Sequence, residues 1–433
     1  MANEDISQSS SPKSNDLRNR ILFTISILCI YRLGTFVPIA GIDPYALQEV
    51  MSSTQKGLLG MFNVFSGGAV SRMAIFALGI MPYISSSIIV QLLTGVSDYF
   101  KNLKDQGELG RKKITQITRY GTVMIACLQG YGVAAGLENA GNLVLNPGIQ
   151  FKLMTMLSLV AGTTFLMWLG EQITSRGIGN GISLIIFSGI VAEIPRALAS
   201  TFELGRTGAL SATMIVGIFV LIIATVLFIV FIERAMRKIP INYPKRQVGN
   251  KVYGGESSHL PLKINTSGVI PAIFASALLL LPITFSNFGL SESDIFLDFA
   301  SLFSQGKPLY MMLYAFGIIF FSFFYTSIVF NPKETAENLR RYGGYVPGIR
   351  PGERTAEYIE NILVKLTTIG ASYLTIVCLM PEFLIAKYPI PFYLGGTSVL
   401  IVCVVAMDTI TQVQTRLMSS QYESLIKKAR FNR

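Results

Sequence analysis

Residues that usually carry catalysis are scarce in this sequence of 433 residues. It contains one histidine, His259, and only 14% of its residues are charged, whereas a soluble protein of ordinary composition carries about 25%. One histidine cannot supply a zinc site or activate a nucleophile without further partners. The sequence also lacks the G-x-x-x-x-G-K-[ST] pattern of a phosphate-binding loop. An enzyme is therefore not expected, and neither is a cofactor.

Cysteines and cleavage signals are scarce as well. The four cysteines lie within apolar stretches, and none is spaced for zinc; they are Cys29, Cys127, Cys378 and Cys403. We interpret them as small packing residues and expect no metal site. The first twenty residues are polar and rich in Ser and Asn, so we expect no cleavable signal peptide.

Hydrophobic residues are abundant instead: they make up 51% of the chain, and the mean hydropathy is +0.51. They are concentrated in blocks, and a helix that crosses a bilayer needs about 20 such residues. Ten blocks come close to this length: 21–38, 74–94, 117–137, 152–172, 182–200, 212–232, 268–287, 309–330, 361–381 and 391–412. We therefore expect an all-α membrane protein with ten spans.

Basic residues alternate between the segments that join these blocks. If the N-terminus is cytosolic, the segments on the cytosolic side hold 28 of the 36 Lys and Arg residues. Basic residues keep to that side in membrane proteins, so the alternation supports ten spans and predicts that both termini are cytosolic. The net charge of +11 then lies mostly in the cytosol, where it favours anionic lipid, ribosomal RNA or acidic protein as partners.

The spans divide into two halves of five. The expected domains are a cytosolic tail at 1–20, the halves 21–200 and 201–412, and a second tail at 413–433. Because five is odd, the halves would run in opposite directions, as in inverted repeats with the functional path between them. Two cytosolic loops, 233–267 and 331–360, are longer than a connection needs. We expect a hairpin-like excursion in the first loop, and a helix-like stretch followed by a turn in the second.

The most informative stretch runs from Phe62 to Leu93. A short apolar run breaks at Ser66, Gly67 and Gly68 before a second apolar run that is long enough to span. Irregular backbone at membrane depth is tolerated only where protein or a water-filled cavity covers it. This pattern predicts a cavity inside the membrane with a short mobile element in it, and hence a channel or a carrier.

An ion-coupled carrier usually has carboxylates or histidines inside its spans. The predicted spans hold few ionisable residues, among them Arg32, Glu171 and Asp408, and we interpret each as structural. This scarcity counts against a secondary transporter of a small solute, which stays as the alternative function. The glycines of the RGIGNGIS stretch at 176–183 favour a tight turn between two spans over a nucleotide site, because no strand precedes them.

Seven motifs resemble the SecY family, whose members are central subunits of bacterial protein-conducting channels. They are FNVFSGGAVSRMAIFALGIMPYISSSIIVQLL, FLMWLGEQITSRGIGNGIS, HLPLKIN, GVIPAIFAS, FNPKETAENL, VPGIRPG and SSQYESLIKKA, in this order along almost the whole chain. The resemblance implies ten transmembrane helices in two inverted five-helix halves around a central pore that holds a short plug helix. It also implies a translocase that conducts unfolded secretory polypeptides and releases transmembrane segments laterally into the bilayer.

The resemblance assigns roles to particular residues. The pore ring would consist of Ile80, Ile84, Ile182, Ile186, Ile273 and Ile401. The plug, at 62–76, would include Phe62, Phe65, Gly67, Gly68, Ser71 and Arg72. A lateral gate would use Ser85, Gln91 and Asn265, and Arg350, Lys251 and Arg246 would dock partners. Two of the ring pairs are four residues apart, so each pair shares one helical face, although packing alone also explains such pairs.

Prolines fall in both helices of the implied gate. Pro82 lies in the second span, and Pro271 and Pro282 lie in the seventh. Proline removes a helical hydrogen bond and permits a kink. We therefore expect kinks in these two spans.

The resemblance also implies partners: the subunits SecE and SecG, the motor SecA, the translating ribosome, and signal peptides with their nascent chains. The implied location is the bacterial inner membrane. The sequence departs from the family at Asn250 and Lys251, where paired basic residues are common. Contact there would be weaker, and more of it would fall on Arg350.

Overall fold

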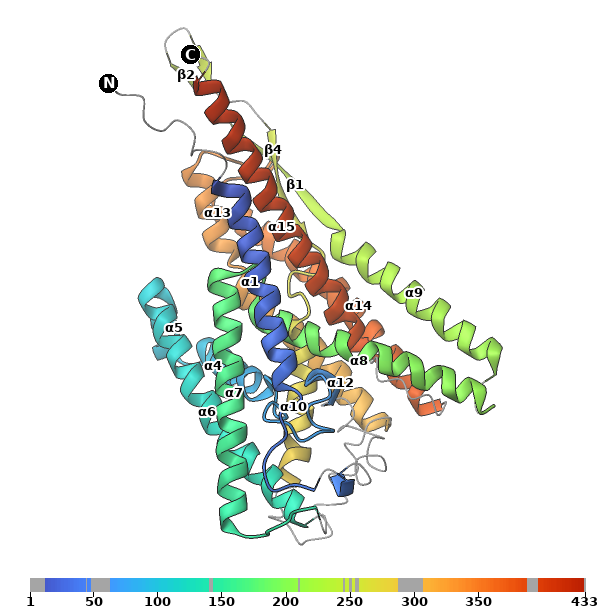
Figure 1. The fold of residues 1–433 in the computed structure, drawn as a ribbon. Helices are drawn as coiled ribbons and strands as arrows, with labels where there is room; N and C mark the ends of the chain where they lie inside the picture. Colours follow the sequence, from blue (N-terminus) through green and yellow to red (C-terminus); the bar gives the residue numbers. More distant parts are fainter. Residues whose placement is uncertain are drawn as a thin grey trace, which may run out of the picture. The chain divides into compact units, whose positions relative to one another are not determined.

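The computed structural model describes residues 12–43, 45–47, 63–139, 143–208, 211–243, 246–248, 251–253, 257–286, 307–387 and 396–431. The described chain is mainly helical (Figure 1). It forms two compact units. Unit 1 comprises residues 1–200, 281–300 and 401–433, and unit 2 comprises 201–280 and 301–400.

Each of the ten predicted spans has a helix. The helices are α1 (Pro12–Gly34), α4 (Met81–Val96), α6 (Glu108–Asn139), α7 (Ile149–Arg176), α8 (Gly181–Arg206), α9 (Ala212–Arg234), α10 (Ile270–Ser286), α12 (Pro308–Val329), α14 (Glu353–Lys387) and α15 (Gly396–Phe431). Among the described residues, seven helical stretches are long and apolar enough to cross a membrane, and Met81–Val96 and Ile270–Leu279 are shorter apolar helices. The chain is therefore an all-α membrane protein, as predicted.

In unit 1, α6 and α7 lie side by side (Figure 1) and are joined by two ion pairs. Arg119 donates two hydrogen bonds to Glu171, at 2.8 and 2.6 Å, and Lys152 lies 2.8 Å from Glu138. The short helix α5 (Asp98–Asp105) connects α4 to this pair.

The glycine-rich stretch between α7 and α8 is a tight turn, as predicted. Its backbone N–H groups donate hydrogen bonds to side-chain oxygens of three helices. Ile178 donates to Thr24 of α1 at 3.2 Å, and Gly179 donates to Gln412 of α15 at 3.0 Å. Gly181 donates to Thr174 of α7 at 2.9 Å. The turn therefore ties these helices together inside unit 1.

Unit 2 carries the two long loops. In the first, β1 (Met236–Asn242) pairs antiparallel with β4 (Ser257–Lys263), and β2 (Arg246–Val248) pairs with β3 (Lys251–Tyr253). In the second, α13 (Pro332–Arg341) is followed by a turn that includes Gly343. Both expectations for the loops are confirmed.

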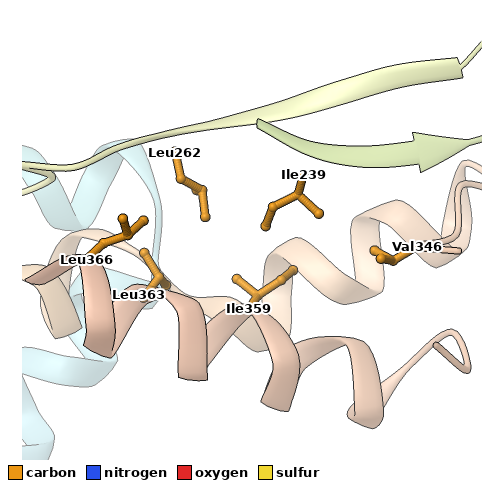
Figure 2. Close-up of a cluster of buried hydrophobic side chains, with 6 residues drawn as sticks. All are labelled: Ile239, Leu262, Val346, Ile359, Leu363 and Leu366. Carbon is orange, nitrogen blue, oxygen red and sulfur yellow. The ribbon is translucent and has the colours of Figure 1, made fainter. Parts of the chain in front are cut away.

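A buried apolar cluster joins these loops to α14 (Figure 2). Its members are Ile239 of β1, Leu262 of β4, Val346 of the second loop, and Ile359, Leu363 and Leu366 of α14. The backbones of Asn242 and Tyr345 also exchange two hydrogen bonds, at 2.9 and 3.0 Å. The first loop, the second loop and α14 therefore share one small core, which we call the platform core.

The structure corrects two expectations about the spans. The second span was expected from residue 74, but α4 begins at Met81, and residues 66–80 form turns. Pro82 and Pro271 are the second residues of α4 and α10, so they start helices and do not kink them. Proline is tolerated there because the first N–H groups of a helix have no intrahelical partner. Of the three prolines, only Pro282 lies in a helix interior.

Candidate functional site

Residues 63–80, which we call the 63–80 segment, form one helical turn at 63–65 followed by tight turns, between α1 and α4 in the chain. Asn63 organises its first half: its carbonyl accepts the N–H of Gly68 at 2.8 Å, and its side chain accepts the N–H of Ser71 at 2.9 Å. The Ser71 hydroxyl donates to the carbonyl of Gly68 at 2.9 Å. These bonds satisfy backbone groups that a helix would otherwise pair. The segment can therefore stay folded without being a span.

Gly67 and Gly68 allow the sharpest part of this segment, with φ values of +66° and +84°. They also allow close approach to α8, because the Cα atom of Gly189 lies 3.0 Å from the point where a Cβ on Gly67 would stand. A Cβ on Gly68 would collide with the carboxylate of Glu193. The glycines therefore serve both the turn and its fit against α8, and their role in a plug stays a prediction.

Two arginines bind the segment to the end of α1. Arg32 donates from Nη1 to the carbonyl of Gly67 at 2.7 Å, and Arg72 donates to the carbonyl of Thr35 at 3.4 Å. Their guanidinium carbons lie 4.9 and 4.1 Å from the centre of the Phe36 ring. A cation near an aromatic ring at this distance is attracted by the ring's quadrupole. The predicted plug residue Arg72 and Arg32 thus meet at one aromatic ring.

Glu193 of α8 is a functional candidate that the sequence analysis missed. Its side chain is 8% exposed, and it lies beside Gly68 near the Arg72 guanidinium. The signal was present in the sequence, because Ile182, Ile186, Gly189 and Glu193 recur at helical spacing and share one face of α8. The expectation that the spans hold almost no carboxylates was therefore wrong for α8. Glu233, which lies just past the predicted span 212–232, is a second buried carboxylate, at the end of α9.

The six predicted ring isoleucines are divided between the units. Ile80, Ile84, Ile186 and Ile401 are buried, and Ile182 is half-buried, all in unit 1. Ile273 is half-buried and belongs to unit 2. Closure of a ring by all six stays a prediction.

The predicted gate residues occupy different surroundings. On α4, Ser85 is buried and Gln91 reaches Ser87 of the same helix at 3.4 Å. In unit 2, Asn265 donates to Glu233 at 2.6 Å and to the carbonyl of Gly268 at 3.1 Å. Asn265 therefore ties the end of α9 to the entry of α10, and a role at a gate stays a prediction.

The predicted docking residues lie on the two loops of unit 2. Arg350 is exposed at the end of the second loop, where its carbonyl accepts the hydroxyl of Thr355 at 3.0 Å. Val346 of the same loop is buried in the platform core (Figure 2). Arg246 begins β2 and Lys251 begins β3. Phe62 of the predicted plug lies outside the described residues, and Phe65 belongs to the single helical turn at 63–65.

The described residues form apolar helices of spanning length, with a broken segment packed on one of them. This arrangement is typical of a helical membrane conduit or carrier. The comparisons choose between these classes. A family model described as SecY matches residues 74–410, more than half of the chain. The chain belongs to the SecY family, and it is a subunit of a protein translocation channel and not an enzyme.

Curated relatives agree over nearly their full length. A protein translocase subunit SecY of Rickettsia bellii is 55% identical over 425 residues, covering 97% of this chain and 98% of the relative. The SecY subunit of Escherichia coli K12 is 54% identical over 427 residues, covering 98% and 96%.

Solved structures share the fold. A protein-conducting channel matches with a TM-score of 0.67 at 16% identity, covering 93% of both chains. Sec61 in a canine ribosome–channel complex from the endoplasmic reticulum matches with a TM-score of 0.65 at 16% identity, again covering 93% of both. A SecY structure whose plug domain is described as stabilising the closed state and maintaining a membrane seal matches at 0.66 and 19% identity, with 93% of both chains covered.

Proposed function

We propose that this channel subunit conducts unfolded secretory polypeptides across the bacterial inner membrane and releases apolar segments sideways into the bilayer. The observation that carries the proposal is the 63–80 segment, which is folded by its own hydrogen bonds and packed against α8 through glycines. The turn at Gly67 and Gly68 is held by polar contacts, for which water can substitute when the turn moves. The likeness to a SecY whose plug domain maintains a membrane seal supports the same role for this segment.

The closed state of this channel would depend on the isoleucines as well as on the plug. Apolar side chains around a narrow path exclude ions, because an ion would lose its hydration without replacement. Four of the six predicted ring residues are buried in unit 1. Ser85, Gln91 and Asn265 would form polar contacts at the lateral gate, which opens toward lipid.

The partners follow from the family and from the docking loops. SecE and SecG would complete the channel, and SecA or the translating ribosome would dock at Arg350, Arg246 and Lys251. Two matched structures are of channels with ribosomes, the canine Sec61 complex and a yeast Ssh1 complex bound to the 80S ribosome. An exposed guanidinium on an anchored loop suits bidentate contact with carboxylate or phosphate.

The charge pattern supports the orientation of the subunit. Both termini and the two long loops would be cytosolic, because that arrangement places 28 of the 36 Lys and Arg residues on the cytosolic side. Anionic headgroups of the inner leaflet are attracted to such a surface.

Reconstitution tests the proposal. Vesicles that contain this subunit with SecE and SecG should import an unfolded secretory precursor when SecA and ATP are added outside. Vesicles without the subunit provide the control. Saturable uptake of a small solute without SecA, together with no import of precursor, would support the transporter and refute the conduit.

A further inference from the structure

Two side chains from other elements meet the 63–80 segment at its turn, Gly67 and Gly68. Arg32 of α1 holds the Gly67 carbonyl at 2.7 Å, and Glu193 of α8 occupies the space that the missing side chain of Gly68 leaves open. The two residues of the segment that they contact, Gly67 and Gly68, are adjacent in the chain. Arg32 and Glu193 therefore approach the same turn of the segment from two different helices.

Helix α8 links this turn to the predicted ring. Ile182, Ile186, Gly189 and Glu193 lie on one face of α8. The backbone of the segment approaches that face at Gly189, where a Cβ would stand 2.9 Å from the carbonyl oxygen of Phe65. One face of one helix thus carries ring residues, the contact surface for the segment, and a buried carboxylate.

Three charged side chains surround the turn, and their contacts with it can be exchanged. Arg32 and Arg72 both lie near the Phe36 ring, and Glu193 lies near Arg72. Arg32 binds a backbone carbonyl and not a carboxylate, and water or another acceptor can replace such a partner when the segment leaves. A charge-assisted hydrogen bond is strong while the site is dry.

We propose that Arg32 and Glu193 are positioning residues that latch the 63–80 segment in its closed seat, Arg32 through the Gly67 carbonyl and Glu193 beside Gly68 and Arg72. The inference rests on the proposed function, because it takes this segment to be the plug. Opening then requires Arg32 to exchange the Gly67 carbonyl for another acceptor. A purely structural role would instead lower the stability of unit 1 without changing the seating of the segment.

Single-channel recording on the reconstituted complex with SecE and SecG tests the latch. Arg32→Gln should raise the fraction of time that the resting channel conducts ions by about tenfold, the size expected for losing one charge-assisted hydrogen bond. Glu193→Gln removes the negative charge beside Gly68 and Arg72 and should raise this fraction as well. Arg32→Lys keeps the charge and a donor, so it should lie between wild type and Arg32→Gln. Arg119→Gln breaks the bidentate pair to Glu171 elsewhere in unit 1 and should leave the resting conductance unchanged.

Chemical labelling supplies a readout that general loss of stability does not reproduce. In a variant whose four native cysteines are replaced by serine, a single Ser71→Cys reports exposure of the segment to a membrane-impermeant maleimide. Adding Arg32→Gln should speed labelling about tenfold, and adding Arg119→Gln should not change it.

Deletion of 62–76 separates the latch from the proposed plug. If the deletion raises resting conductance while Arg32→Gln and Glu193→Gln conduct and label like wild type, the latch is refuted and the plug stands. If the deletion leaves the resting conductance unchanged, the plug is refuted, and the latch, which depends on it, is refuted as well. Equal increases from Arg119→Gln would show a general structural effect and overturn the inference.

Discussion

The 63–80 segment and the loop that carries Arg350 are held in place by different forces. In the first, the turn at Gly67 and Gly68 is fixed by hydrogen bonds to backbone carbonyls and by glycine contacts with α8, whereas Met73, Ala77 and Leu78, further along the segment, are buried in apolar clusters. The second is fixed by the platform core and by a backbone pair between Asn242 and Tyr345 (Figure 2). Polar contacts can be exchanged for water, whereas a buried apolar cluster must be exposed to come apart. The polar turn at Gly67 and Gly68 therefore suits a part that moves, and the platform core suits a surface that must keep its shape for a partner.

The largest effect is expected at Arg350, on the exposed end of the 331–360 loop. Arg350→Glu should abolish SecA-driven translocation, because it replaces a cation that suits carboxylate contacts with an anion that repels them. The platform core lies apart from this side chain, so insertion and assembly with SecE should persist. Precursor import into vesicles at physiological salt measures the effect, and normal import by this variant would remove the docking role.

Lys251→Glu is the matched charge reversal. It should reduce import less than Arg350→Glu does, since a basic residue that is common in the family is already replaced there by Asn250. An equal loss from both variants would point to the overall charge of the surface and not to Arg350.

The next effect tests whether the platform depends on its apolar core. Ile359→Ala removes a fully buried side chain of α14, and such truncations cost about 2–5 kcal/mol. Limited proteolysis should then cleave the 331–360 loop faster, and SecA binding should weaken. Ile369→Ala on the same helix is the control, because Ile369 is exposed; comparable proteolysis of both variants would contradict a core that stiffens the loop.

A third prediction concerns the other region. Ile186→Asn introduces a polar group at a buried position on the α8 face that also contacts the 63–80 segment, at a cost of about 1–3 kcal/mol to a dry closed state. The channel should open more readily and pass precursors with weakened signal sequences. Ile186→Leu keeps the volume and should behave like wild type. If Ile186→Asn lowers only the amount of folded protein, the isoleucine is part of a core and not of a seal.

The sequence predicted the elements of both regions but not their contacts. Hydropathy and charge were enough for ten helices, because a bilayer forces apolar residues into runs. The true start of α4 was missed because Met73 to Ile80 is apolar yet folds into turns, with Met73 at a φ of +41°. Glu193 was missed because its partners, Gly68 and Arg72, are distant in sequence. The platform core was missed for the same reason, since residues from 239 to 366 meet in it.

The smallest effect is expected from a surface ion pair on α13, in the 331–360 loop. Arg341 and Glu337 are four residues apart on α13, 2.7 Å from each other, with side chains 69% and 61% exposed. Solvent-exposed pairs of this kind contribute about 0.3–0.5 kcal/mol. Arg341→Ala should therefore leave the free energy of unfolding and the proteolysis of the 331–360 loop nearly unchanged, in contrast to Ile359→Ala. Thermal unfolding in mild detergent at low and high salt measures this. Arg341→Ala could instead lower the free energy of unfolding as much as Ile359→Ala does, and high salt could lower it equally in the wild type. That result would show that surface charge, and not the apolar core, stabilises this part of unit 2.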